Sequence, residues 1–352
     1  MQRLCFIVLL LISFSAGAKT VPSTDYFNTE AYWQKLQLQA DGIKPYTKAG
    51  DTCIVVVSNR APQPGQLRFM GETCDGVLHY FFVKVQQGKW LVYPAADLQT
   101  ALQYIPLKNN DWLVYTEGMG KLFTSDLDRG INVAAQYRVN VILLDYPSIT
   151  STKGQLGNYT FAIQHAKAAY KDFLPVLEHI KMMKGKGQLA ANSHLSLFFH
   201  SMGNNVISEI VLNHKLDALN NGVWVDNLIL NAPCVPEKDH TKWLNQIAFA
   251  KHIYVHYNPD DHTLKGAHLV SFHRQLGEHV YPPVSNKATY INFSVLAGEG
   301  HSNFLTLYGR PPAKPAAIRH YNILFHGSAV DVSDMKYYYP SHYQDIGYTI
   351  VP

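Results

Sequence analysis

The sequence predicts an α/β fold with a mostly parallel central sheet, helices on both faces and an antiparallel start. Two observations carry this prediction. From about residue 110 onward, apolar strand-like runs alternate with helical stretches, and this order requires crossover connections between parallel strands. Before residue 110, short runs rich in β-branched and aromatic residues follow one another across turn residues, as in antiparallel sheets.

The elements follow from composition and periodicity. The strand-like runs are 52–58, 66–71, 77–85, 89–94, 111–118, 139–148, 195–201, 225–234, 250–261 and 289–301. The helical stretches are 29–39, 125–137, 161–180 and 203–216. The second of these is expected to begin at an N-cap, Ser125 or Asp126. Pro175 should kink or split the third.

We expect one domain over residues 19–352, because no repeat or low-complexity linker divides the chain. Its antiparallel part is 19–110, its catalytic body is 111–310, and its tail is 311–352. The tail carries the run KYYYPSHY (336–343), for which a packed aromatic segment is favoured over a ligand surface.

Composition argues against several classes of function. Hydrophobic residues make up 47% of the 352 positions and charged residues only 16%, which favours a large core over disorder. The net charge of +4 comes from scattered lysines and arginines, so no nucleic-acid partner is expected. Nucleotide-binding glycine motifs and HExxH are missing from the sequence, and we expect no cofactor and no metal. His252 and His256 belong to a strand-like run, where they would lie ~13 Å apart, too far to share a zinc ion.

The first 18 residues predict a secretory signal peptide. Arg3 supplies a positive n-region, and residues 4–14 form an apolar run shorter than the ~20 residues of a spanning helix. Ala16-Gly17-Ala18 is a cleavage signal, so we expect cleavage before Lys19 and export to the periplasm or the extracellular space. The mature chain would then hold no transmembrane segment. An uncleaved anchor is the alternative.

Export makes disulfides permissible for the cysteines that remain after cleavage removes Cys5. Cys53 and Cys74 lie in one strand-rich region and are expected to pair, which leaves Cys234 unpaired. The alternative is three buried free thiols.

The stretch FHSMG (199–203) ends a buried strand and opens a helix. A serine at such a turn stands at the carboxyl edge of a parallel sheet, beside helical N–H groups that stabilise an oxyanion, as in the nucleophile elbow G-x-S-x-G. Phe199 replaces the first glycine of that pattern, and an ordinary helix N-cap at Ser201 is the alternative. Partners for a triad follow in the order acid then histidine, with Asp260 and Asp261 after one strand and His301 after the next.

With these motifs, residues 110 to 305 resemble the alpha/beta-hydrolase superfamily. The resemblance is to a bacterial family of uncharacterised hydrolases with an A-H-S-M-G-N elbow and an N-D-R-A-L acid motif. The matching segments here are FHSMGN (199–204), LILNAPCV (228–235), DDHTL (260–264) and DYPS (145–148), the last similar to a W-P-S in that family.

The resemblance implies a Ser201, Asp261 and His301 triad. In the family's pattern an apolar residue stands three positions after the acid, and Leu264 does so for Asp261, which leaves Asp260 as the alternative acid. The histidine would take the serine's proton, and the acid would orient the imidazole.

The oxyanion hole needs two N–H donors. Met202 should supply one, and the loop after the first parallel strand should supply the other, from Met119 or, second, Gly118. Glu117 stands where many relatives carry histidine.

These residues predict an exported serine hydrolase that cleaves a small or lipid-like ester. Apolar residues near the expected site, Phe199, Met119 and Met202, favour an acyl chain if they face the pocket. The alternatives are a hydrolase of amides or peptides and a non-catalytic binding protein on the same fold. The sequence does not indicate an oligomeric state.

Overall fold

The structure is a computed structural model that describes residues 30–106, 110–190, 192–307, 311–341 and 345–352. The predicted signal peptide, with Cys5, lies outside these residues, as do positions 342 and 343 of the tyrosine-rich run. In the described part of the chain, none of the helices has the length and apolar character that crossing a membrane requires.

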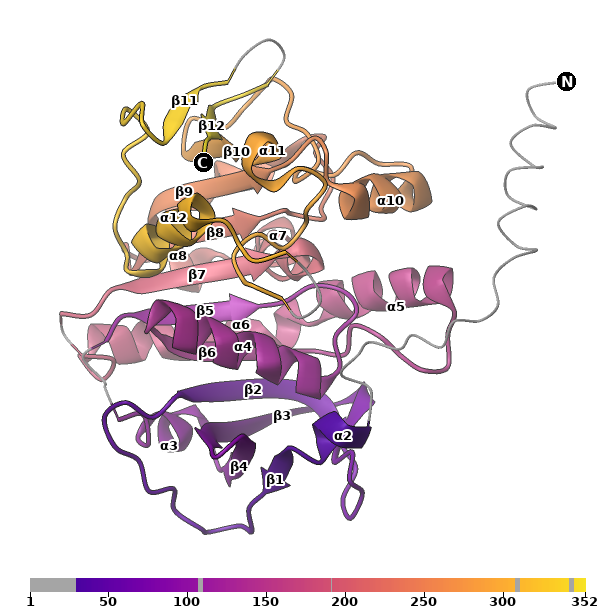
Figure 1. Ribbon diagram of the computed structural model, residues 1–352, viewed down its shortest axis with the longest axis vertical. Coiled ribbons are helices and arrows are strands. Elements are labelled where there is room, and N and C mark those ends of the chain that lie inside the picture. Colours follow the sequence, from indigo (N-terminus) through magenta and orange to yellow (C-terminus); the bar gives the residue numbers. More distant parts are fainter. Residues whose placement is uncertain (1–29, 107–109, 191, 308–310, 342–344) are drawn as a thin grey trace, which may run out of the picture.

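A single twelve-stranded sheet runs through the molecule from one end to the other (Figure 1). Its strands, in spatial order, are β1 (Leu36–Leu38), β4 (Lys89–Ala95), β3 (Met70–Gln86), β2 (Cys53–Pro62), β6 (Asn140–Asp145), β5 (Trp112–Thr116), β7 (Leu195–His200), β8 (Val225–Asn231), β9 (Ala250–Tyr257), β10 (Ala288–Asn292), β12 (Tyr348–Ile350) and β11 (Tyr338–Pro340).

Strand β2 joins an antiparallel part of the sheet to a parallel part. It pairs antiparallel with β3 on one side and parallel with β6 on the other. From β6 through β10 every neighbouring pair is parallel, so the carboxyl ends of these strands meet at one edge. The predicted fold class, a mostly parallel sheet with an antiparallel start, is confirmed.

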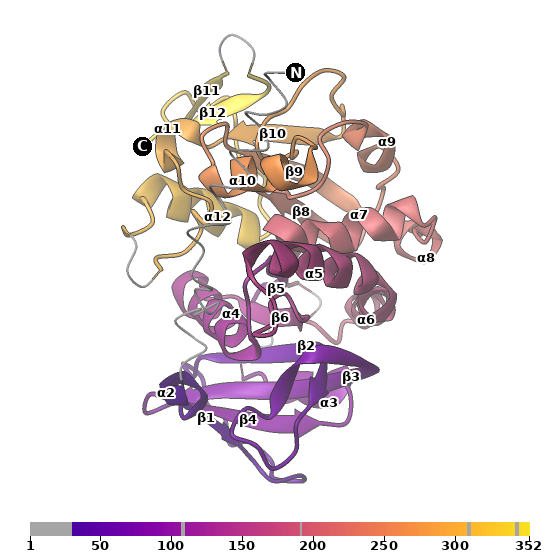
Figure 2. The same ribbon diagram turned by 90° about the vertical axis from the view of Figure 1, so that its right-hand side faces the viewer.

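Helices cover both faces of the sheet. On one face lie α2 (Glu30–Trp33), α4 (Phe123–Tyr137), α11 (Ser294–Ala297) and α12 (Pro315–Phe325). The other face carries α3 (Leu98–Leu102), α5 (Gln155–Ala168), α6 (Tyr170–Gly185), α7 (Asn204–Leu212), α8 (Asp217–Asn220), α9 (His240–Leu244) and α10 (His262–Ser271). Figure 2 shows α4 and α12 on one side of the strands and α6 and α7 on the other.

Each face of the sheet has its own hydrophobic core, because successive strand residues point to opposite faces. In β2, Val55 and Val57 belong to the core under α5 and α6, whereas Ile54 and Val56 belong to the core under α4. All four side chains are fully buried. This explains why the central strands read as continuous apolar runs rather than as alternating ones.

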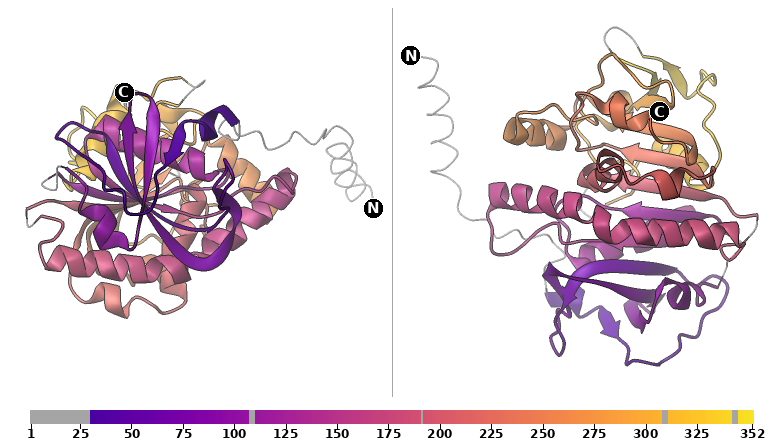
Figure 3. Two further views of the ribbon diagram at one scale, coloured as in Figure 1. Left: turned by 90° about the horizontal axis from the view of Figure 1, so that it is seen from below. Right: turned by 180° about the vertical axis from the view of Figure 1, so that it is seen from behind.

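Two predicted helix boundaries require correction. Helix α4 begins at Phe123, so neither Ser125 nor Asp126 is its N-cap; the Ser125 hydroxyl instead accepts the Leu122 N–H at 2.8 Å and closes the first turn. The long helical stretch does divide, but at Ala169 rather than at Pro175, which lies inside α6. The right-hand view of Figure 3 shows α5 and α6 crossing the face of the strands one after the other.

Three segments were also placed by long-range pairing. In the stretch 29–39, predicted as one helix, the described residues 30–39 form only the short helix α2 and then strand β1, which pairs with β4. The runs 66–71 and 77–85 merge in one 17-residue strand, β3. In the tail, β12 pairs parallel with β10 and thereby extends the sheet.

The expected disulfide between Cys53 and Cys74 is wrong. Both cysteines and Cys234 are free thiols. The register of β2 on β3 places Cys53 opposite Lys84, whereas Cys74 stands opposite Arg60. Seven strand residues therefore separate the two cysteines along the sheet, or roughly 23 Å at ~3.3 Å per residue. This is far beyond the ~7 Å that a bridge allows between Cα atoms.

Candidate active site

Ser201 stands directly after strand β7, at the carboxyl edge of the sheet. Its φ of 52° lies in the left-handed region, which serine rarely adopts. The single turn η2 (Ser201–Gly203) follows, and α7 continues from it. The carbonyl of Ser201 accepts the Asn204 side-chain N–H at 2.9 Å and the Cys234 backbone N–H at 3.1 Å, and these bonds hold the unusual conformation. Backbone strain of this kind is often retained at functional sites.

Two close contacts explain the glycines around this turn. A Cβ on Gly203 would lie 2.6 Å from the carbonyl oxygen of Glu117. A Cβ on Gly118 would lie 2.6 Å from Cβ and 3.0 Å from Oγ of Ser201. The elbow and the loop after β5 therefore touch backbone to backbone. Phe199 does not crowd the turn, because its side chain is buried in the core beneath α5 and α7.

The loop after β5 brings candidate oxyanion donors to Ser201. A Cβ atom added to Gly118 would lie 3.1 Å from the backbone nitrogen of Met202. The loop therefore lies against both the Ser201 hydroxyl and the Met202 N–H group. The Gly118 N–H already donates to Oε2 of Glu117 at 2.8 Å. Gly118 is therefore a poor second donor, and Met119, whose side chain is half-buried, is the better candidate of the two.

Glu117 is a buried carboxylate at the end of β5. Its Oε1 accepts the Tyr115 hydroxyl at 2.5 Å and lies 3.6 Å from Arg129. Burial alone would raise the pKa of Glu117, but nearby cations and the bond from Tyr115 hold that pKa well below its usual range. Burial also lowers the pKa of the neighbouring His200 and keeps it neutral, so Arg129 and Lys121 are the cations that act at neutral pH.

His301 and Asp261 form a tight pair on the same rim. Nδ1 of His301 lies 2.6 Å from Oδ2 of Asp261. The other carboxylate oxygen of Asp261 caps α10 by accepting the N–H groups of Thr263 and Leu264, at 2.9 and 3.0 Å. Asp261 is therefore held by the helix while it contacts the imidazole. Its neighbour Asp260 is largely exposed, 3.8 Å from Lys265.

The acid loop and the histidine loop are tied together by Asn258. Its side-chain N–H groups donate to the carbonyls of Gly298 and Gly300, at 2.7 and 3.0 Å. Among the described residues, no hydrogen bond joins the Ser201 hydroxyl to His301. Of the two hydrogen bonds expected in the triad, the structure therefore has the one between Asp261 and His301 and lacks the one between His301 and Ser201. Catalytic hydrogen bonds are often long without substrate and tighten when it binds.

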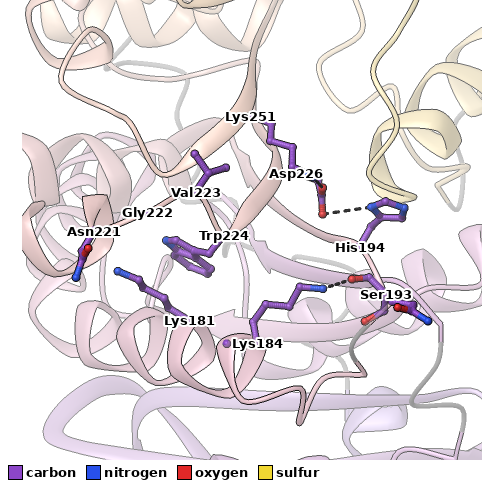
Figure 4. A pocket seen from close by; sticks show the side chains of 12 residues that line it. Lys181, Lys184, Ser193, His194, Asn221, Gly222, Val223, Trp224, Asp226 and Lys251 are labelled. Carbon is purple, nitrogen blue, oxygen red and sulfur yellow. Dashed lines mark hydrogen bonds and ion pairs between the residues drawn. The ribbon is translucent and has the colours of Figure 1, made fainter.

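One cavity lies beside this site and another lies far from it. A very small one, about 10 Å³, lies beside Asp261 and His301. A larger one of about 460 Å³ is lined by Lys184, His194, Trp224 and Lys251 (Figure 4). These residues belong to the amino ends of β7, β8 and β9 and to α6, so this cavity opens at the edge of the sheet opposite Ser201.

The histidines considered as metal ligands are dispersed. His256 is buried in β9 while His252 is exposed, and within the described residues no three His, Cys, Asp or Glu side chains gather as a metal site would need. His262 and His268 lie near Glu299 and Glu278, respectively.

Sequence reasoning missed two buried polar residues, the first of them beside the site. One is Asn231, which ends β8 and donates to Nδ1 of His200 at 2.8 Å. The other is Arg60, fully buried in β2 with its Nε 2.9 Å from Asp145. Both could have been found in the sequence as polar residues within otherwise apolar strand-like runs.

The parallel sheet, the strained serine turn and the Asp–His pair are the features of an alpha/beta hydrolase. A family model described as an alpha/beta hydrolase of unknown function (DUF900) matches residues 95–290, and the chain belongs to this family. The match includes Ser201 and Asp261 and ends before His301. No curated protein and no solved structure matches the chain.

Proposed function

We propose that the protein is a serine hydrolase that cleaves an ester through an acyl-enzyme, with Ser201 as nucleophile, His301 as general base and Asp261 as the acid of the triad. The observation that carries the proposal is the 2.6 Å contact between His301 Nδ1 and Asp261 Oδ2. When the Nδ1–H group donates a hydrogen bond to this carboxylate, Nε2 carries the basic lone pair.

The chemistry follows from these positions. The Ser201 oxygen attacks the carbonyl carbon of the ester, and its proton passes to Nε2 of His301. The oxyanion that forms accepts the N–H groups of Met202 and Met119, each worth ~3–4 kcal/mol in such a site. The intermediate then expels the alkoxide, which takes the proton back from His301. Water repeats the sequence on the acyl-enzyme and releases the acid.

Ester cleavage is preferred over amide cleavage on chemical grounds, because an alkoxide leaves more readily than an amine and demands less of the general acid. The three apolar residues that suggested an acyl chain do not all support it equally. Phe199 and Met202 pack in the core, and Met119 is half-buried in the loop after β5, next to Gly118, which touches Ser201. Met119 alone therefore supports a contact with the acyl group.

A fluorophosphonate probe tests the nucleophile without knowledge of the substrate. It should label the mature protein at Ser201, and the Ser201→Ala variant should stay unlabelled. Absence of label on wild type would reject the serine mechanism and favour a binding role for the fold.

Assays with p-nitrophenyl esters of graded chain length then test the substrate class. Ser201→Ala and His301→Ala should each lower kcat by a factor on the order of 10⁴–10⁶. Peptide cleavage without ester cleavage would overturn the ester assignment and leave the mechanism in place.

We also propose that the protein is exported and cut after Ala18. The support is the order of Arg3, the apolar run 4–14 and the small residues 16–18. Intact-mass analysis of the exported form should give a chain that begins at Lys19, and a chain that still begins at Met1 would reject this.

A further inference from the structure

A continuous chain of hydrogen-bonded side chains runs behind the active-site rim into the C-terminal segment. It crosses β7, β8 and β9 and ends on α12 and β11, and all of its members except the partly exposed first are buried. In order, these members are Ser302, His200, Asn231, His256, His320 and Tyr338. No step of the proposed mechanism uses the five members that follow Ser302.

The amide of Asn231 fixes the proton positions in the middle of the chain. Its Oδ1 accepts the Tyr321 hydroxyl at 2.5 Å and also lies 3.1 Å from Nδ1 of His256. Because an amide oxygen only accepts, His256 must carry its proton on Nδ1. A neutral His256 then presents a bare lone pair at Nε2.

The proton positions toward the C-terminus follow in the same way. Nε2 of His256 lies 3.0 Å from Nε2 of His320, so His320 must carry its proton on Nε2 and donate it. Nδ1 of His320 is then an acceptor, 2.7 Å from the hydroxyl of Tyr338, which donates to it.

The proton of His200, toward the active site, is placed in the same way. The Asn231 side-chain N–H donates to Nδ1 of His200, so the proton of His200 is on Nε2, which faces the Ser302 hydroxyl at 3.1 Å. Every donor in the chain therefore points the same way, from Tyr338 toward Ser302. With the Asn231 amide in this orientation, only one tautomer of each imidazole fits.

Neutral imidazoles are a condition of this arrangement, since a protonated ring would present two donors. Burial lowers the pKa of all three, that of His320 to about 3 and those of His200 and His256 well below their usual range. The charged groups that face His200 are Glu117, which opposes the lowering, and His301, Arg129 and Lys121, which add to it.

We propose that His200 and Asn231 are positioning residues of the active site, and that the C-terminal segment holds them in place through this chain. That this rim is an active site rests on the proposed function. Ser302 directly follows His301, and the ring of His200 packs against that of His301 with centroids 4.8 Å apart. The bond from His200 to Ser302 therefore anchors the loop that carries the general base, while a neutral His200 adds no charge beside it.

Histidine nitrogen NMR on the full mature chain tests the tautomers directly. His200 and His320 should carry the proton on Nε2 and His256 on Nδ1, with no titration between about pH 5 and 8. Removing the terminal hydroxyl with Tyr338→Phe should disturb the signals of His320 and His256. The control Tyr290→Phe removes a buried hydroxyl bonded to His240, outside the chain, and should leave those signals unchanged. A proton on Nε2 of His256, or titration of any of the three, would overturn the proposal.

The rate of fluorophosphonate labelling at Ser201 tests the link to the active site. Asn231→Leu removes the amide's bonds to His200, His256 and Tyr321, and loss of the bond to His200 alone should slow labelling about tenfold. Tyr338→Phe should slow it less. Tyr290→Phe should label at the wild-type rate. Equal rates in all of these proteins would reject the positioning role. A wild type that is never labelled would reject the serine mechanism instead, and the NMR result would still decide whether the chain exists.

Discussion

The imidazole of His301 contacts the carboxylate of Asp261 at 2.6 Å, although forty positions separate the two residues. Each comes from a loop at the carboxyl end of a neighbouring parallel strand, β9 for the acid and β10 for the histidine. The parallel pairing of these strands is what brings the two loops together.

Asp261→Asn should lower kcat/KM for an ester by about 10³–10⁴, because an amide cannot stabilise the imidazolium that forms on His301. Asparagine still caps α10, so thermal stability should fall little. Asp260→Asn is the matched control, since Asp260 is exposed and points to Lys265. Equal losses in the two variants, measured by steady-state kinetics, would contradict this choice of acid.

Gly118→Ala should abolish labelling of Ser201 by a fluorophosphonate. The added methyl group would lie 2.6 Å from Cβ of Ser201, a distance that requires the backbone of the loop or the elbow to move. Gly266→Ala, in α10, meets nothing within 4 Å and should label normally, with stability raised by about 0.5–1 kcal/mol. Normal labelling of Gly118→Ala would show that the loop is not part of the site.

Glu117→Gln should reveal a pH-dependent contribution of this carboxylate to stability. The folded pKa is held below its value of about 4.3 in an unfolded chain, so the ionised group stabilises the fold above about pH 4–5. This contribution is lost as the pH falls through the folded pKa. Urea unfolding should therefore show the largest difference between wild type and variant near pH 7 and a smaller one near pH 3. A difference that does not change with pH would contradict the ionised state.

Arg60→Met should destabilise the protein by about 3–5 kcal/mol, because it leaves the buried carboxylate of Asp145 without its cation. Lys251→Met removes a cation whose side chain is 58% exposed from its pair with Asp226, and should cost no more than about 1 kcal/mol. Chemical denaturation of both variants measures the two costs. Similar losses of unfolding free energy in the two variants would mean that solvent screens the Arg60–Asp145 pair as strongly as an exposed ion pair.

The thiols should react in an order set by exposure. In the native protein, Cys74 should react with a thiol reagent before Cys53 and Cys234, because its side chain is exposed and theirs are buried. Burial raises the pKa of Cys53 and Cys234 to about 12 and that of Cys74 to about 11, so exposure rather than acidity sets the order. After unfolding without reductant, all three should be alkylated. Recovery of a peptide pair linked through Cys53 and Cys74 would contradict the register of β2 on β3.

The sequence by itself determined the features that depend on neighbours along the chain. Continuous apolar runs predicted buried strands, and the order of strands and helices predicted a parallel sheet. The turn at Ser201 could be read in the same way, because it depends on a few adjacent residues. The choice of Asp261, three residues before the buried Leu264, came instead from the family resemblance. Parallel topology then implied that loops after successive strands share an edge.

Only the tertiary structure decided the features that depend on pairing between distant segments. The register of β2 on β3 separates Cys53 from Cys74, and no local pattern encodes that register. The carboxylate of Glu117 occupies the Gly118 N–H, and the tail from α12 to β11 reaches His256 through His320. A hydrogen bond between buried groups is set by the packing of two sheet faces and their helices, so the same residues read one by one gave no sign of their partners.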